Sequence, residues 1–169
     1  MKSNGRTRSG STQFYKKLGR GNGDHNAIAA WTNKRSTKVD VFEKDLVFVP
    51  IHVPGHWCCG VINMRAKKFE HYDSLGSPNP TFFRYIRSWL AGEAHMKGKR
   101  GFEMPILERW DTESTNQPQQ TNSVDCGVFV SQCVRYRCAQ HALDFSEDDM
   151  TALRLKMTYE IRKKQLQPL

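Results

Sequence analysis

The sequence lacks any long apolar run, and this absence excludes the usual kind of membrane-spanning protein. A transmembrane helix needs about 20 consecutive, mostly apolar residues, whereas this chain is 38% hydrophobic and 25% charged over its 169 residues. The first twenty residues are basic and glycine-rich, without the apolar centre of a secretory signal peptide. We therefore expect an intracellular protein that does not bind membranes.

The sequence also lacks the paired cysteine spacings that structural zinc sites use. Its cysteines form an odd set with no CxxC pair, and they offer no tetrahedral set of ligands at chelating spacings. Thiols of intracellular proteins stay reduced as a rule. We therefore predict no disulfide, no metal and no cofactor. The cysteines are Cys58, Cys59, Cys126, Cys133 and Cys138.

Positive charge is abundant but is not gathered in one block. The formal net charge is +9, and the basic residues are spread from Lys2 to Lys164 and do not form one block with interleaved aromatic residues. Such a pattern fits a solvated basic surface, and we do not expect nucleic acid as a specific ligand. The length fits one domain, and no internal repeat is visible. We expect a flexible basic arm over residues 1–11 and a single domain over 12–169.

Hydrophobic periodicity predicts a mixed α+β chain in which three consecutive strands form an antiparallel meander. The expected strands cover residues 46–52, 57–64 and 68–72, with a hairpin turn at 65–68. The expected helices cover residues 12–18, 79–91, 128–140 and 146–165, and Gly92 is expected to end the second of them. Residues 104–110 fit either a short strand or a turn.

The stretch 118–129 has the profile of a nucleophile at the start of a helix. Cys126 stands between Asp125 and Gly127, after an amide-rich turn and before an apolar run. Aspartate is a good N-cap residue, and the positive end of the helix dipole favours a thiolate over a thiol. An isolated cysteine is more often a small buried apolar residue. The assignment therefore depends on partners elsewhere in the sequence.

A histidine and an aspartate on neighbouring strands supply such partners. His56 precedes the second strand and Asp73 follows the third. If these strands pair through their turn, their far ends meet and bring His56 and Asp73 side by side. This register favours His56 over His52, at the end of a buried strand, and over His71, which we expect to face away from the site. Alternatively, Asp73 serves only as a turn residue, because the sequence Asp-Ser-Leu-Gly favours a turn.

An oxyanion formed at Cys126 needs hydrogen-bond donors besides the backbone. Gln120 lies six positions before Cys126 and can fold back toward it. Gln117 and Gln119 are competitors that the sequence leaves open. Trp57, beside His56, fits either a cover over a narrow channel or a core aromatic residue.

With these residues in place, the chain resembles the SUMO-specific (sentrin-specific, Ulp-type) cysteine proteases. The similarity runs from about residue 11 to residue 166, and its order His, Asp, Gln, Cys differs from that of papain. The matching motifs are VDVFEKDL at 39–46, VPIH at 49–52, HW at 56–57, YDSLG at 72–76 and PQQTNSVDCG at 118–127.

The resemblance implies a papain-like, circularly permuted fold, with a central, mostly antiparallel sheet flanked by helices. It also implies roles for individual side chains. By this resemblance the triad is His56, Asp73 and Cys126, the oxyanion donor is Gln120, the tryptophan over the channel is Trp57, and residues that contact the body of SUMO are Phe14 and Trp31.

The implied reaction is hydrolysis after the C-terminal Gly-Gly of SUMO, which matures a precursor or releases SUMO from a lysine. We expect SUMO or SUMO-conjugated proteins as partners, a monomer, and a nuclear or nuclear-envelope location, with the cytoplasm as the alternative. The family domain normally starts several dozen residues earlier, so we expect an N-terminally truncated version of it. The alternative functions are a protease for another ubiquitin-like modifier, such as a deneddylase, and a catalytically impaired SUMO-binding module.

Overall fold

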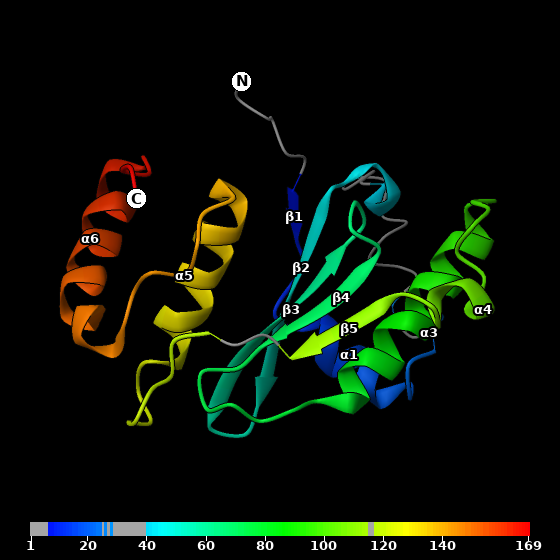
Figure 1. The fold of residues 1–169 in the computed structure, drawn as a ribbon, viewed down its shortest axis with the longest axis horizontal. Coiled ribbons are helices and arrows are strands. Elements are labelled where there is room, and N and C mark those ends of the chain that lie inside the picture. The colour runs from blue at the N-terminus through cyan, green and yellow to red at the C-terminus, as the bar shows by residue number, and fades with distance from the viewer. Residues whose placement is uncertain (1–6, 25, 27, 29–39, 115–116) are drawn as a thin grey trace.

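The computed structural model describes residues 7–24, 26, 28, 40–114 and 117–169. They form one five-stranded sheet with helices on both faces (Figure 1). The three central strands are antiparallel, and each edge strand runs parallel to its neighbour. This is the predicted α+β architecture with a mostly antiparallel sheet. In spatial order the strands are β1 (Thr7–Ser9), β2 (Leu46–Val53), β3 (His56–Asn63), β4 (Lys68–Tyr72) and β5 (Asp111–Ser114).

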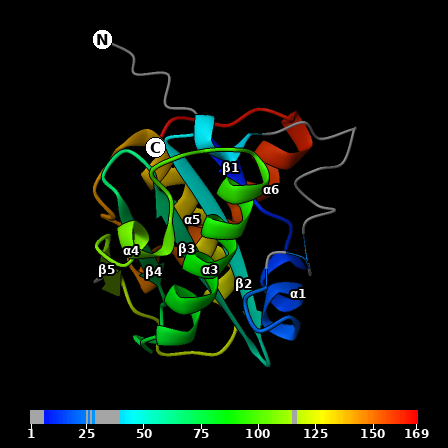
Figure 2. The ribbon, with the colours of Figure 1, turned by 90° about the vertical axis from the view of Figure 1, so that its right-hand side faces the viewer.

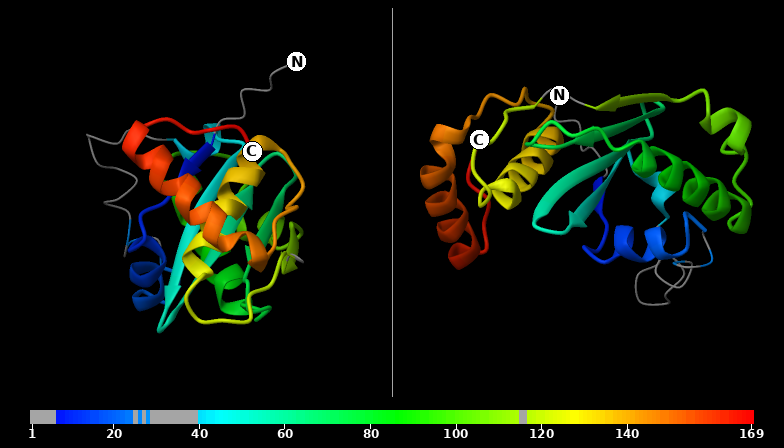
Figure 3. Two further views of the ribbon diagram at one scale, coloured as in Figure 1. Left: turned by 90° about the vertical axis from the view of Figure 1, so that its left-hand side faces the viewer. Right: turned by 90° about the horizontal axis from the view of Figure 1, so that it is seen from below.

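Helices cover the two faces of the sheet unequally (Figures 2 and 3). One face carries α1 (Phe14–Arg20) and α3 (Pro80–Met96), and the other carries α5 (Cys126–Ala139) with α6 (Met150–Lys163) packed outside it. The shorter elements are η2 (Val41–Glu43), α4 (Met104–Leu107) and η3 (Glu147–Asp149). Within the described part of the chain, no helix has both the length and the apolar character needed to cross a membrane.

The central meander and most helices match the sequence prediction, but the two edge strands were missed. β1 lies inside the stretch 1–11 that we expected to be a flexible arm, and residues 1–6 of that stretch lie outside the described residues. β5 follows the undecided segment 104–110, which itself contains α4. Both strands are short and polar, and they pair through their backbones at an edge, so no hydrophobic alternation marks them.

The prediction that Gly92 ends a helix was wrong. α3 continues through Gly92 to Met96, and the residues just after this glycine, Glu93 and Ala94, are buried. The Glu93 carboxylate also forms an ion pair with Lys97, 2.6 Å away. Burial of this last turn outweighs the cost of a helical glycine, which is about 1 kcal/mol.

Three apolar clusters hold the layers together. The largest joins α1 and α3 to the sheet, the second joins α5 to the other face, and the third joins α5 to α6. The first includes Phe82, Ile86, Trp89 and Leu90; the second consists of Phe48, Cys59, Val61, Tyr72 and Cys133; the third consists of Val128, Phe129, Phe145 and Met150.

The packing of α3 on the sheet requires a glycine in β3. A Cβ atom added at Gly60 would lie 2.2 Å from Cζ of Phe82, far inside van der Waals contact. Phe82 is fully buried, with aromatic neighbours such as Tyr15, His71 and Phe83. Gly60 therefore sets the distance between the first helical layer and the strand that carries His56.

Candidate active site

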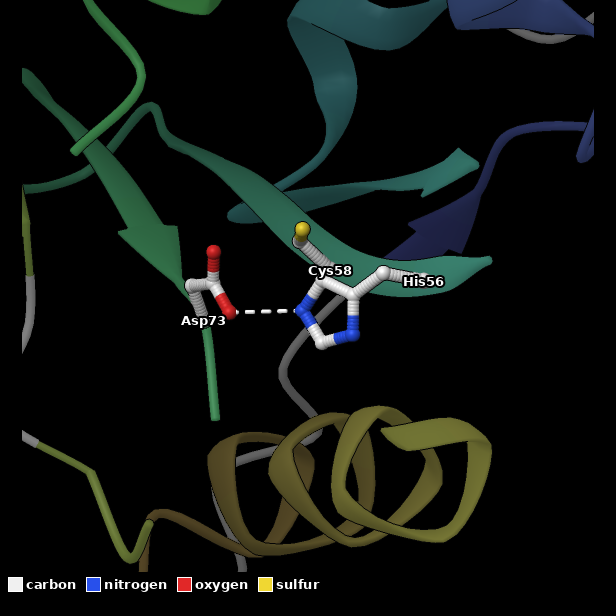
Figure 4. A group of neighbouring side chains, drawn as sticks. All are labelled: His56, Cys58 and Asp73. Carbon is white, nitrogen blue, oxygen red and sulfur yellow. Dashed lines mark hydrogen bonds and ion pairs between the residues drawn. The ribbon is translucent and has the colours of Figure 1, made fainter. Parts of the chain in front are cut away.

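The β3–β4 hairpin brings His56 and Asp73 together, as its register predicted. His56 is the first residue of β3, and Asp73 directly follows β4. His56 Nε2 lies 2.7 Å from Asp73 Oδ1, and both side chains are buried (Figure 4). Rigid antiparallel pairing thus fixes an imidazole–carboxylate pair at one end of the sheet.

Asp73 serves the turn and the histidine with the same oxygen atom. Its Oδ1 also accepts a hydrogen bond of 2.8 Å from the backbone N–H of Leu75. Gly76 closes the turn by donating to the Asp73 carbonyl at 3.0 Å, and its φ of +72° suits glycine. The turn therefore orients the carboxylate toward His56.

The hydrogen bond to Asp73 decides which nitrogen of His56 can act as a base. An ionised carboxylate only accepts, so Nε2 carries a proton and Nδ1 is left as the acceptor of a neutral ring. Figure 4 shows one ring nitrogen bonded to Asp73 and the second nitrogen on the side of the ring away from Asp73. The helix that Cys126 opens, α5, packs against β3, the strand that His56 begins.

Cys126 is the first residue of α5 and is buried, with 6% of its surface exposed. Its thiol is close enough to the Cys58 thiol for an electrostatic interaction. Cys58 in turn lies within 4.8 Å of the ligand atoms of both His56 and Asp73. Through Cys58, the Cys126 thiol is thus placed near the histidine–aspartate pair, at a helix end whose first N–H groups have no intrahelical partner.

Asp125 holds the N-cap position, but its side chain does not cap the helix as we expected. Its backbone is helical (φ −100°, ψ −5°), whereas an N-cap side chain normally needs an extended backbone. The carboxylate instead accepts hydrogen bonds from Asn122 Nδ2 at 2.8 Å and from Arg154 Nη2 at 2.6 Å. Arg154 lowers the pKa of Asp125. The ion pair connects α6 to residues 118–125, the segment before Cys126, which we call the nucleophile loop.

The other two histidines lie in surroundings different from those of His56. His52 is exposed, and its ring centroid lies 4.4 Å from that of Trp57, its partner across β2 and β3. His71 is buried against Phe82 and Phe83, its Nε2 has no hydrogen-bond partner among the described residues, and burial lowers its pKa. Both positions favour His56 as the base.

Gln119 and Gln120, two of the three candidate glutamines, differ in how their amide hydrogens are used. Gln119 Nε2 donates to the carbonyls of Asp73 and Gln117, which occupies both hydrogens. Gln120 Nε2 donates to Asn122 O at 2.6 Å, while its Oε1 accepts from Ser74 Oγ at 2.7 Å. Its second N–H has no partner among the hydrogen bonds of the described residues. Gln120 therefore has a donor to spare, and its role at the oxyanion stays a prediction.

The remaining predicted substrate contacts lie in different surroundings. Trp57 is half-buried beside His56, and its ring packs against that of His52 at an interplanar angle of 38°. Phe14 is buried, with its ring edge-on to Trp89 at 5.0 Å, so it belongs to the core beneath α1. Trp31 lies outside the described residues. Contacts of Phe14 and Trp31 with a partner stay predictions.

Cys58 completes a group of three potential metal ligands with His56 and Asp73 (Figure 4). Burial raises the pKa of the Cys58 thiol far above its usual range, and the charge of Asp73 adds to this. Two of the three donors already share a hydrogen bond, and a structural zinc site needs a further ligand. The group is best described as a hydrogen-bonded pair beside a protonated thiol.

Sequence reasoning missed the residues that hold the nucleophile loop. Glu147 and Arg154 contact residues 121–125 from η3 and α6, more than twenty positions further along the chain. Their sequence context is a capping box and an amphipathic helix, which explains them without the loop. Ser74, which holds Gln120, is adjacent to Asp73 in the sequence and could have been found from that proximity.

A cysteine at a helix start, beside an imidazole that a carboxylate orients, is the arrangement of thiol proteases. The sequence profile of the Ulp1 protease family, C-terminal catalytic domain, matches residues 2–167. This chain belongs to the Ulp1 protease family.

Relatives and solved structures agree with this membership. The chain is 36% identical over 141 residues to a sentrin-specific protease of Caenorhabditis elegans, covering 83% of this chain and 19% of that protein. It is 33% identical over 159 residues to human sentrin-specific protease 2, covering 92% of this chain and 26% of that protein. It thus spans well under half of either relative.

The fold matches solved Ulp1 structures. The C-terminal Ulp1 protease domain, solved in complex with Smt3, the yeast ortholog of SUMO, superposes with a TM-score of 0.77 at 26% identity. The match covers 95% of this chain and 70% of that one. The Ulp1-like catalytic domain of Chaetomium thermophilum has a TM-score of 0.79 at 15% identity, covering 96% and 63% of the two chains. The predicted family and fold are confirmed.

Proposed function

We propose that this chain is a thiol protease that cleaves after the C-terminal Gly-Gly of a SUMO-type modifier. It would release the modifier from lysine side chains, mature its precursor, or do both. The observation that carries this proposal is the buried His56–Asp73 pair beside Cys126 at the start of α5. Relatives named as sentrin-specific proteases, and a solved relative bound to Smt3, support the choice of modifier.

In the proposed reaction, Nδ1 of His56 takes the proton of the Cys126 thiol, and Asp73 stabilises the imidazolium. The thiolate attacks the carbonyl carbon of the terminal glycine. The resulting oxyanion accepts hydrogen bonds from the Cys126 backbone N–H and from the second N–H of Gln120. Collapse expels the lysine amine, which takes the proton from His56, and leaves a thioester on Cys126. A water molecule, deprotonated by His56, then hydrolyses this thioester.

The substrate tail and the location of the protein are further parts of the proposal. Trp57, half-buried beside His56, would cover the tail, because only glycine residues are narrow enough to pass beneath an indole ring. We also propose that the chain acts as a monomer in the nucleus. Gel filtration with light scattering, and imaging of a fluorescent fusion, test these two points.

Activity-based probes test the proposed function. SUMO, NEDD8 and ubiquitin, each carrying a C-terminal propargylamide, would be incubated with the chain, and adducts detected by intact mass. We expect an adduct with SUMO that Cys126→Ser abolishes and that Cys138→Ser, at an exposed cysteine, leaves unchanged. Capture of NEDD8 alone would identify a deneddylase, and SUMO binding without an adduct would identify an inactive binding module.

A further inference from the structure

We propose that Glu147 is a positioning residue for the oxyanion site, which it aligns by holding Asn122. This inference rests on the proposed function, because it assigns a task to the donors of Gln120 and Cys126. Glu147 belongs to the short η3 turn between α5 and α6. It is separated from Asn122 by 25 positions in the sequence.

The hydrogen bonds that orient the two donors of the proposed oxyanion site both involve Asn122. Its backbone carbonyl accepts the hydrogen bond from Gln120 Nε2 at 2.6 Å, which requires the N–H side of that amide to face it. Its side-chain Oδ1 accepts from the backbone N–H groups of Val124 and Asp125, at 2.9 and 3.1 Å. The peptide that follows Asp125 carries the Cys126 N–H. A shift of Asn122 would therefore move both donors together.

Glu147 binds this part of the loop with four hydrogen bonds. Its Oε1 accepts from the backbone N–H of Thr121 at 2.8 Å, from the backbone N–H of Asn122 at 3.3 Å and from Asn122 Nδ2. Its Oε2 accepts from Thr121 Oγ1 at 2.8 Å. Several donors converge on one carboxylate, and these surroundings suit an ionised acid, which only accepts hydrogen bonds. The same bonds lower the pKa of Glu147.

The position of Glu147 is itself fixed by packing. Ser146 and Asp149 form a capping box at the start of η3. Phe145 and Met150, on either side, are buried in the cluster that joins α5 to α6. The backbone that carries the carboxylate is thus held against α5, the helix that begins at Cys126. The carboxylate can therefore hold residues 121 and 122 in a fixed position.

The experiment compares Glu147→Ala with Glu147→Gln and with Asp148→Ala, an exposed neighbour that serves as the matched control. The substrate is SUMO carrying a C-terminal aminomethylcoumarin. Misalignment of donors that are each worth roughly 10²–10³-fold should lower kcat of Glu147→Ala by about tenfold or more, with KM little changed. Glu147→Gln retains acceptor and donor atoms for the same partners and should recover most of the loss.

Two further readouts separate positioning from a loss of folding. Alkylation of Cys126 by iodoacetamide needs no oxyanion site, so its rate should be unchanged in Glu147→Ala. In a Gln120→Ala background, the same substitution should cost less than it does alone, because only the Cys126 N–H is then left to be misaligned.

The outcomes are distinct. An unchanged kcat in Glu147→Ala would overturn the inference, and so would equal alanine and glutamine variants or fully additive losses with Gln120→Ala. Absence of turnover in the unmodified chain would instead refute the proposed function.

Discussion

The substitution Asp73→Asn isolates the charge of the carboxylate from its geometry. Both the His56 Nε2–H and the Leu75 N–H converge on Oδ1 of Asp73, at 2.7 and 2.8 Å. An asparagine held by Leu75 keeps its amide oxygen at this point, so the histidine tautomer and the turn should persist. What is lost is the negative charge beside the imidazolium.

The size of this loss follows from the distance and the burial of the pair. Two unit charges 2.7 Å apart attract by about 6 kcal/mol at an effective dielectric constant of about 20, which is an upper figure. Breaking a buried, hydrogen-bonded charge pair costs about 2–5 kcal/mol in practice. We therefore expect kcat/KM of Asp73→Asn to fall roughly 10²–10³-fold.

Hydrolysis of SUMO-aminomethylcoumarin, with thermal unfolding measured in parallel, tests this estimate. The unfolding temperature should change little, because the turn keeps its hydrogen bonds. Asp73→Ala removes the acceptor altogether and should be slower still. The reasoning is refuted if Asp73→Asn retains activity within about threefold of the unmodified chain, since the predicted loss is far larger.

Three other results are expected. Gln120→Ala should lower turnover roughly 10²-fold, as loss of one oxyanion donor does; unchanged turnover would assign that role elsewhere. Gly60→Ala should lower the free energy of unfolding in urea by about 3 kcal/mol, because overpacking costs about 1–3 kcal/mol and the added Cβ would lie 2.2 Å from a fully buried ring. Combining it with Phe82→Leu should relieve part of this cost. Additive losses in the double variant would contradict the steric explanation. The pKa of Glu147 is lowered in the folded protein, so its ionised form stabilises the fold at pH values above 4.5, the usual pKa of a glutamate. This contribution is lost as pH falls through the folded pKa. The melting-temperature difference between the unmodified chain and Glu147→Gln should therefore shrink on acidification, and a difference that grew would contradict the assignment.

The sequence allowed the central hairpin and its pair of polar residues to be predicted, for a physical reason. Strands joined by a short turn admit few registers, because a slip by one residue would exchange the side chains that pack against the two helical layers. The pairing of Cys59 with Tyr72 and of Asn63 with Lys68 confirms the expected register. His56 and Asp73 then follow as neighbours without any further information.

The missed features depend on contacts that have no local signal. β1 and β5 are polar edge strands defined only by backbone pairing with their neighbours. Asp125 looked like a helix cap, but Arg154 and Asn122 take up its carboxylate instead. Long-range polar partners of this kind become visible only when the packing of α6 against α5 is known.

The central claim is that His56 acts as the base for Cys126, and selective alkylation of that cysteine tests it most directly. The chain would be treated with iodoacetamide near neutral pH, and the modified peptide quantified by mass spectrometry, with the exposed Cys138 as an internal standard. We predict that His56→Ala slows modification of Cys126 by about tenfold or more relative to Cys138, because thiolate is the reactive form. Equal relative rates in the two proteins would contradict the claim.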